Sequence, residues 1–186
     1  MQIIDYTCPQ SGDRSLTMHV GQYIERVCER FGISSNRPAN TPLPAGFNSS
    51  KADCPTEAQE VEQMKGLPYR ALIGCLMWAV VSCRPECLYA LSHLSKFLVN
   101  PGMKHWKAAL HVARYLKNTP ERGITLFSPY EDRLKPIVMS GRCDSSHADV
   151  VDDRKSTIGW TWIINGPVVS CSKRATHRTL WSKAPR

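Results

Sequence analysis

The spacing of apolar residues changes once along this chain, and the change limits the folds it can adopt. From residue 69 to 118 apolar side chains recur every three or four positions, as on one face of an α-helix. Beyond Asn118 they alternate with polar side chains, as in a strand with one buried face. Helices therefore come first and a small sheet second, and this order predicts an α+β fold.

Three helices are expected in the helical part. The first covers about residues 69–82 and includes an eleven-residue apolar run, 71–81. Because a membrane span needs about 20 such residues, this run indicates a core helix. The second helix begins near Pro85, which suits the first helical position. After a break at Pro101-Gly102, the third helix covers about 104–117.

The residues ahead of these helices predict a hairpin, a helix and a connector. The hairpin lies within residues 1–16, and the helix covers 21–31 with Gly32 as its C-terminal cap. Residues 33–68 are rich in proline and predict an extended, poorly packed linker with one short acidic helical turn near 56–64.

The second part of the chain predicts an antiparallel sheet. Short strands are expected at 124–127 and 137–140, and the clearest strand at 157–165. Asn165-Gly166 is a strong hairpin turn, after which 168–172 returns as the next strand. The cluster 173–186, with five basic and no acidic residues, predicts a frayed basic tail.

Charge is distributed unevenly along the chain. The net charge is +8, and apolar residues make up 42%, enough for a packed core. Residues 1–68 contain 6 basic and 8 acidic side chains, whereas residues 69–186 contain 18 and 8. The basic excess of the second part favours an acidic partner such as a nucleic acid.

The third predicted helix presents a stripe of basic side chains at steps of three or four residues. Its members are Lys104, Lys107, His111, Arg114 and Lys117. One interpretation is an ordinary solvated helix face. The other is a surface that contacts the phosphates of a duplex without reading its sequence.

The eight cysteines are scattered and none forms a CxxC pair. No apolar signal segment precedes the first strand, so we expect reduced thiols and an intracellular location, cytoplasmic or nuclear, rather than secretion. Cys83 and Cys87 lie in apolar helical pattern and are expected to be core thiols.

A series of short phrases occurs in a fixed order along most of the chain. They lie at Tyr23–Gly32, Thr41–Leu43, Pro68–Gly74, Arg84–Glu86, Leu94–Phe97, Asn100–Gly102, His105–Trp106, Arg114–Lys117 and Asp152–Thr157. Their order and spacing, over about residues 16–173, resemble the polyprotein of copia-type LTR retrotransposons. The resemblance implies the thumb and connection of a reverse transcriptase, running into the start of a ribonuclease H domain.

The resemblance also indicates which active-site residues to look for. The polymerase motif of the family, Tyr-x-Asp-Asp, does not occur in these residues, and Asp152-Asp153 lacks its preceding Tyr-x. Asp144 occupies the first carboxylate position of ribonuclease H, whereas the next acidic position is Ser146. The Trp position is His147, and the position of the family's later glutamate falls at Ala184.

Ribonuclease H chemistry needs several carboxylates to hold two metal ions about 3.5–4 Å apart. The family uses Mg²⁺, and Asp144 is the one candidate ligand here, so we expect no bound cofactor and no nuclease activity. A solvated Asp144 at a strand end is the simpler interpretation. Cys143, His147 and Asp149 do not match a structural zinc spacing.

The five tryptophans offer a further alternative, stacking platforms for single strands. Trp78 and Trp106 lie on apolar helix faces and are expected in the core. Trp160 and Trp162 share one strand face, which a missing covering helix would leave partly bare. The fifth is Trp181 in the tail.

The sequence thus predicts four regions. Residues 1–68 form a hairpin, helix and linker, 69–118 a three-helix thumb- or connection-like segment, 119–172 an incomplete ribonuclease H-like antiparallel sheet, and 173–186 a basic tail. The expected function is that of a catalytically inactive polyprotein fragment, with no membrane or small-molecule substrate. Two alternatives remain open: a non-enzymatic module that binds an RNA–DNA or DNA duplex, and a relic without a stable fold of its own.

Overall fold

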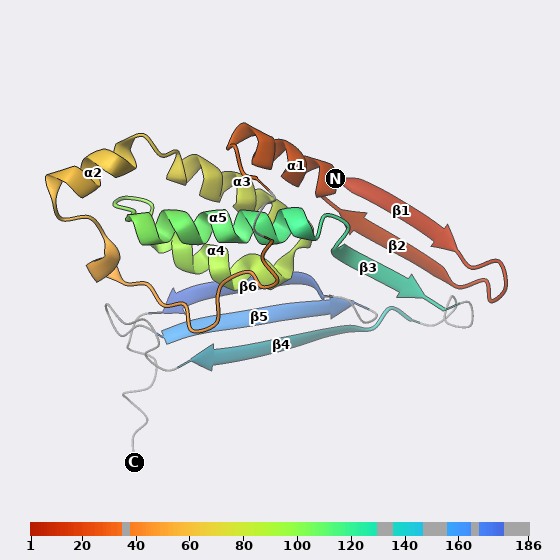
Figure 1. The fold of residues 1–186 in the computed structure, drawn as a ribbon. Coiled ribbons are helices and arrows are strands. Elements are labelled where there is room, and N and C mark those ends of the chain that lie inside the picture. The colour runs from red at the N-terminus through yellow and green to blue at the C-terminus, as the bar shows by residue number, and fades with distance from the viewer. Residues whose placement is uncertain (35–37, 130–135, 147–155, 165–167, 177–186) are drawn as a thin grey trace, which may run out of the picture.

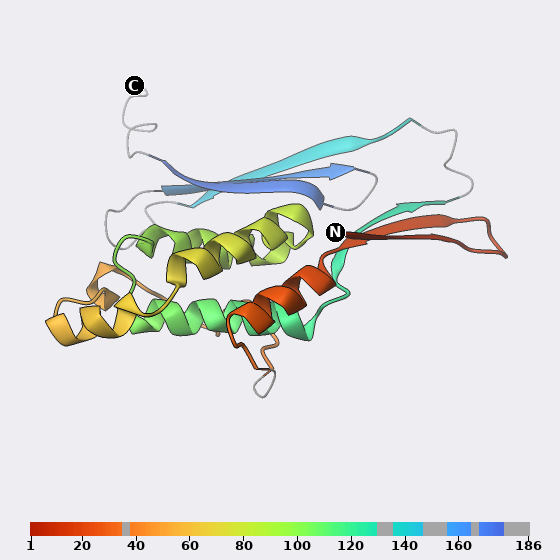
Figure 2. The same cartoon turned by 90° about the horizontal axis from the view of Figure 1, so that it is seen from above.

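The computed structural model describes residues 1–34, 38–129, 136–146, 156–164 and 168–176, and of the last range the backbone alone. Helices form the middle of the molecule. One sheet, β1-β2-β3, extends from one end, and a second sheet, β4-β5-β6, lies along the side of the helices (Figure 1, Figure 2). The expected α+β fold is confirmed.

The chain begins with the predicted hairpin. Strand β1 (Gln2–Thr7) pairs antiparallel with β2 (Arg14–His19). Gly12 has φ of 73° in the connecting turn, a backbone conformation that favours glycine. An exposed ion pair between Asp5 and Arg14 joins the two strands.

Strand β3 (Gly123–Ser128) completes this first sheet, although it lies more than a hundred residues away in sequence. It pairs antiparallel with β2, and the hydroxyls of Thr17 and Thr125 lie 2.9 Å apart across the pair. The pairing places residues 123–128 beside the N-terminal hairpin, outside the sheet expected for 119–172. Short alternating segments specify a strand but not its partner, which explains the difference.

Helix α1 (Gly21–Arg30) follows the hairpin, as predicted. It buries Ile24, Val27 and Cys28 against the other helices. Gly32, with φ of 63°, ends it in the left-handed conformation typical of a helix C-terminus.

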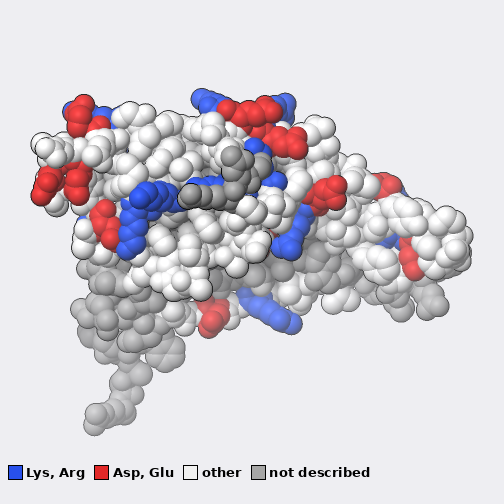
Figure 3. Space-filling view, viewed as in Figure 1, with Lys and Arg blue, Asp and Glu red and all other residues white. Residues whose placement is uncertain are grey.

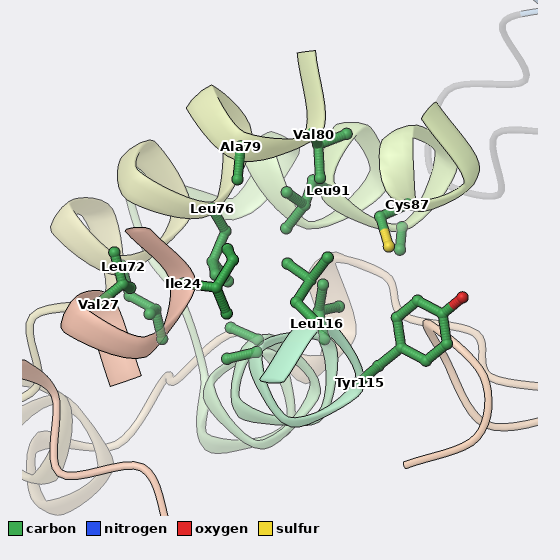
Figure 4. Packing of buried hydrophobic residues seen from close by; sticks show 14 of the residues in the cluster. Ile24, Val27, Leu72, Leu76, Ala79, Val80, Cys87, Leu91, Tyr115 and Leu116 are labelled. Atoms are coloured by element: carbon green, nitrogen blue, oxygen red, sulfur yellow. The ribbon is translucent and has the colours of Figure 1, made fainter. Parts of the chain in front are cut away.

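The middle helices form the core. Helix α3 (Tyr69–Cys83) matches its prediction, but the predicted second helix is divided into three pieces. These are a 3-10 turn η2 (Pro85–Cys87), helix α4 (Leu88–Leu94) and a second 3-10 turn η3 (Ser95–Phe97). Apolar side chains from α1, α3 and α4 converge on Leu116 of α5, as the close view of the core shows (Figure 4).

Helix α5 (Met103–Asn118) is the longest helix among the described residues. Its buried face includes Ala109, Ala113 and Leu116, all fully shielded from solvent. The opposite face contains the predicted basic stripe. Because one face is apolar and the other charged, the core fixes which side of α5 points to solvent.

The proline-rich linker is better packed than its composition predicts. It contains a short 3-10 turn, η1 (Lys51–Asp53), and leads to helix α2 (Ala58–Lys65), the expected acidic turn. Five of its residues are nevertheless buried: Ile33, Ala39, Ser49, Pro55 and Met64. These isolated anchors have no periodic spacing, so sequence patterning does not reveal them.

The second sheet consists of β4 (Met139–Ser146), β5 (Ser156–Ile164) and β6 (Val168–Thr176), in antiparallel order. Strand β6 lies nearest α3 and α4, and every residue of β4 is exposed. Strand β4 begins two residues later and extends further than the predicted 137–140, because its polar second half carries no alternating signal.

The tryptophans depart in part from expectation. Trp78 was expected in the core, yet its side chain is 48% exposed and lies 4.5 Å from the Tyr23 ring, centroid to centroid. Helix α3 is apolar on all sides, so periodicity alone cannot identify its buried face. Trp106 packs against the core, whereas Trp162 is 45% exposed and covers Gly141 of β4.

The predicted frayed tail, 173–186, is wrong at its start, because residues 173–176 continue strand β6 and pair with β5. The rest of that tail, 177–186, and the predicted Asn165-Gly166 turn lie outside the described residues. No single described helix is long and apolar enough to cross a membrane; α2 and α3 pass that test only as a pair bent by 53°.

Candidate nucleic-acid interface

All five predicted stripe residues lie on helix α5. Figure 3 shows a band of basic side chains over this helix, with acidic side chains at one end. Gly102 precedes the helix as its N-cap, and its N–H donates to Nδ1 of His105 at 2.9 Å. This contact, together with the buried face, fixes the orientation of the stripe.

Lys104 is the first cation of the stripe, and it is paired. Its Nζ donates to both carboxylate oxygens of Asp53, at 2.9 and 3.0 Å, and lies 5.9 Å from the centre of the Phe47 ring. The hydrogen bonds from Lys104 lower the pKa of the Asp53 carboxyl, with a smaller contribution from the N–H of Ser50.

Two further stripe residues bind the linker backbone. Nε2 of His111 lies 3.0 Å from the carbonyl oxygen of Thr41. Nζ of Lys117 donates to the carbonyl oxygen of Ile33 at 2.9 Å. Three of the five stripe residues therefore hold the linker against α5.

Lys107 and Arg114 are the remaining members of the stripe. Lys107 is exposed and Arg114 half-buried. Neither forms a hydrogen bond or ion pair with another residue that the structure describes. Since they lie seven residues apart, about two helical turns, both point to the same side of α5.

Sequence reasoning did not identify Asp53 as part of this surface. Its carboxylate accepts the backbone N–H of Ser50 at 2.9 Å, and the Ser50 hydroxyl accepts the N–H of Ala52. The pattern Ser50-Lys-Ala-Asp53 resembles a capping box, and that is the signal in the sequence. The backbone oxygen of Asp53 also lies against Gly102, where a Cβ would approach it to 2.0 Å.

His105 lies beneath the stripe and is fully buried. Since Nδ1 accepts from Gly102, the ring proton belongs on Nε2, which has no partner among the described residues. The ring stacks on Phe97 with centroids 4.0 Å apart. Burial lowers the pKa of His105, because the charged form is poorly solvated there.

The predicted ribonuclease H residues lie at the other sheet. Asp144 is exposed on β4, and its carboxylate accepts only the adjacent N–H of Ser145 among described groups, at 2.8 Å. The Ser146 hydroxyl binds the backbone of Thr157, accepting its N–H at 3.2 Å and donating to its carbonyl at 3.3 Å.

The other residues of this second site add no metal ligand that the structure describes. Cys143 is exposed on β4, and His147 and Asp149 lie outside the described residues. Within the described part of the chain, no three His, Cys, Asp or Glu side chains are grouped closely enough to hold a metal ion.

Comparisons with known proteins give a consistent set of relatives. The chain is 38% identical over 157 residues to the retrovirus-related Pol polyprotein from transposon TNT 1-94 of Nicotiana tabacum, covering 84% of the chain and 11% of that polyprotein. It is 27% identical over 165 residues to a putative transposon Ty5-1 protein of Saccharomyces cerevisiae, covering 89% of the chain and 50% of that protein.

A further relative is named as a secreted effector and not as a transposon protein. It is the secreted RxLR effector protein 161 of Plasmopara viticola, 34% identical over 107 residues, which cover 58% of the chain and 72% of that protein. The chain spans about a tenth of the tobacco polyprotein. No protein-family model and no solved structure matches this chain.

Proposed function

Since this chain belongs to the family of Ty/copia-type retrotransposon Pol polyproteins and represents a fragment of one, we propose that it binds the backbone of a nucleic-acid duplex through helix α5 and has no catalytic activity of its own. In this proposal residues 69–118 correspond to the thumb or connection of the reverse transcriptase. An RNA–DNA or DNA duplex is the partner, and we place the encounter inside the cell, in cytoplasm or nucleus.

The observation that carries the proposal is the pair Lys107 and Arg114. Both project from the solvent-facing side of α5 and have no described partner, so their charges are available to phosphates. Each phosphate neutralised by a cation releases counterions from the duplex, which makes affinity salt-dependent and independent of sequence.

The proposed lack of nuclease activity depends on the second sheet. Two-metal hydrolysis requires several carboxylates in one place. Asp144 supplies one, while the next acidic position of the family is Ser146, whose hydroxyl is engaged with the Thr157 backbone. A neutral hydroxyl in that position cannot replace the charge of a carboxylate toward Mg²⁺.

The binding proposal is tested by reversing the two cations. We expect Lys107→Glu combined with Arg114→Glu to weaken binding of a fluorescein-labelled RNA–DNA duplex by at least about tenfold. The salt slope, which is the change of log affinity with log salt concentration, should fall by an amount that corresponds to about two phosphate contacts. The matched control is Arg26→Glu combined with Arg70→Glu, which changes net charge equally at exposed positions on α1 and α3. Equal effects of the two double variants would show that α5 is not the binding surface.

The nuclease proposal has a separate test. The purified chain is incubated with a labelled RNA–DNA hybrid and Mg²⁺ or Mn²⁺, and hydrolysis is followed on gels. We expect no cleavage above a buffer control. Metal-dependent cleavage that Asp144→Asn abolishes would overturn the proposal, whereas cleavage that survives this substitution would indicate a contaminating nuclease.

A further inference from the structure

The linker runs along the whole of helix α5 in the opposite direction. Its contacts advance from Ile33 to Asp53, while the partners on α5 run back from Lys117 to Lys104. Figure 1 and Figure 2 show the same path, with the linker passing beside α5 on its way to α2. The stripe is therefore partly covered by the chain itself.

The acceptors in these contacts are oxygen atoms, as they would be in a phosphate. Two are backbone carbonyls, and one is the carboxylate of Asp53, which takes two hydrogen bonds from the same ammonium group. A carboxylate that binds Lys104 through both oxygens presents the charge and geometry that a phosphate diester offers. Asp53 thus resembles the ligand that the stripe would bind.

We propose that Asp53 is an internal competitor for Lys104, and that Lys104 exchanges this carboxylate for a phosphate when a nucleic-acid duplex binds α5. The inference rests on the proposed function, since it presumes that the stripe meets phosphates. Competition from Asp53 lowers the affinity of α5 for the duplex. That affinity therefore depends on a residue of the linker, which lies outside α5.

The surroundings of the ion pair permit this exchange. The Lys104 side chain is 47% exposed and that of Asp53 24% exposed, so solvent weakens their attraction. A polar pocket of about 240 Å³ opens beside them, lined by Asp53, Glu60 and Gly102 among others. A rotation of the flexible Lys104 stem moves its ammonium group while the linker backbone keeps its buried anchors.

The test is a double-mutant cycle on the full chain with Asp53→Asn and Lys104→Gln. The asparagine keeps an oxygen for the Ser50 N–H, so it preserves the turn at η1. Affinity for a labelled RNA–DNA duplex is measured at several salt concentrations, and thermal unfolding verifies that each variant is folded. The cycle separates the specific pair from the general effect of removing a negative charge.

We expect Asp53→Asn to raise duplex affinity about threefold to tenfold when Lys104 is present, and by clearly less in the Lys104→Gln background. Lys104→Gln should lower the salt slope by about one phosphate in both backgrounds. Additive effects, or a salt slope unchanged by Lys104→Gln, would overturn the proposal.

The matched control is the exposed pair Glu62 and Lys65 on α2, which lies off the stripe. Glu62→Gln removes the carboxylate that pairs with Lys65 and changes the net charge by the same amount as Asp53→Asn. We expect the duplex affinity of this variant to stay within twofold of wild type. An increase equal to that of Asp53→Asn would mean that charge alone is responsible. If the Lys107 and Arg114 reversal weakens binding but the cycle is additive, the proposed function stands and this inference fails.

Discussion

The guanidinium of Arg84 donates two hydrogen bonds to Thr119 and so joins the end of helix α3 to the end of helix α5. One nitrogen of Arg84 donates to the Thr119 carbonyl oxygen at 2.9 Å and another to its hydroxyl at 2.6 Å. Nε donates to Glu86 at 2.7 Å, and the guanidinium lies 5.6 Å from the centre of the Tyr115 ring. The side chain is only 1% exposed, and each of the three nitrogens of this buried cation has a hydrogen-bond partner.

Replacing Arg84 by alanine should therefore be costly. We expect Arg84→Ala to lower the free energy of unfolding by about 3 kcal/mol, because hydrogen bonds to a charged donor are lost and a buried volume is emptied. Urea denaturation followed by circular dichroism measures the change. Arg70→Ala, at an exposed position of α3, is the control and should change stability by less than about 0.5 kcal/mol.

The helical core determines whether the chain folds on its own. Leu116 is fully buried at the centre of the cluster in Figure 4, and we expect Leu116→Ala to cost about 2–5 kcal/mol. The wild-type chain should unfold in one cooperative thermal transition, and the variant at a lower temperature. A gradual, non-cooperative loss of helical signal in the wild type would favour the alternative of a relic without a stable fold.

The contact between Gly102 and Asp53 gives a prediction of its own. A Cβ at Gly102 would lie 2.0 Å from the Asp53 backbone oxygen, so Gly102→Ala must push η1 away from α5. We expect a loss of about 1–3 kcal/mol in stability. Gly74→Ala is the contrasting control, since nothing lies within 4 Å of its Cβ and alanine favours the helix interior by roughly 0.5–1 kcal/mol. Equal destabilisation of both variants would contradict the close approach.

Sequence reasoning predicted helices α1, α3 and α5 well because their signals are local, whereas the predicted second helix is divided into η2, α4 and η3. Helix α1 ends at Arg30, shortly before Gly32, and α3 follows Pro68, so caps and periodicity mark their bounds. It could not predict that β3 would pair with β2, since the partner of a short strand depends on how the helices between them pack.

The candidate interface was likewise predicted only in part. The stripe on α5 follows from helical spacing, but the pairing of its residues does not. His111 and Lys117 bind backbone oxygens of the linker, and every residue has such an oxygen, so no sequence pattern marks the partner. Lys104 is paired with Asp53, whereas Lys107 has no described partner, and only the fold reveals this difference.

Stability should depend on pH through His105. Burial lowers its pKa below the ordinary value of 6.5, so below about pH 6.5 the unfolded chain binds more protons than the folded one. Stability then rises with pH across this window and falls as the solution becomes acidic. The neighbouring charged or titratable groups are Asp53, Lys104 and His93, and Asp53 titrates at lower pH because its own pKa is reduced.

The variant His105→Asn isolates this contribution. Its amide oxygen can accept the Gly102 N–H but does not titrate, so we expect a smaller fall in stability between pH 7.5 and 5.5 than in the wild type. The absolute stability of the variant should be lower, because the stacking on Phe97 is lost. Urea midpoints at both pH values measure the difference. An unchanged pH dependence would show that another group is responsible.

The cysteines should divide into two classes by their reactivity. Cys83 and Cys87 are buried, as the sequence predicts, and burial raises the pKa of the Cys87 thiol to about 12. Cys143 is exposed, and hydrogen bonds from Ser11 and Gln10 lower the pKa of the half-buried Cys8. Because the thiolate is the nucleophile, Cys8 and Cys143 should react first with iodoacetamide at neutral pH.

Mass spectrometry of tryptic peptides after timed alkylation measures these rates. We expect Cys8 and Cys143 to be labelled in the native protein, while Cys83 and Cys87 are protected until urea unfolds the core. The substitution Cys143→Ser removes one fast site and should leave the labelling of Cys87 unchanged. Cys87 lies at the junction of α3 and α4, which the hydrogen bonds of Arg84 to Thr119 join to the end of α5. Rapid labelling of Cys87 in the native protein would mean that this junction opens readily and contributes little to the stability of the fold.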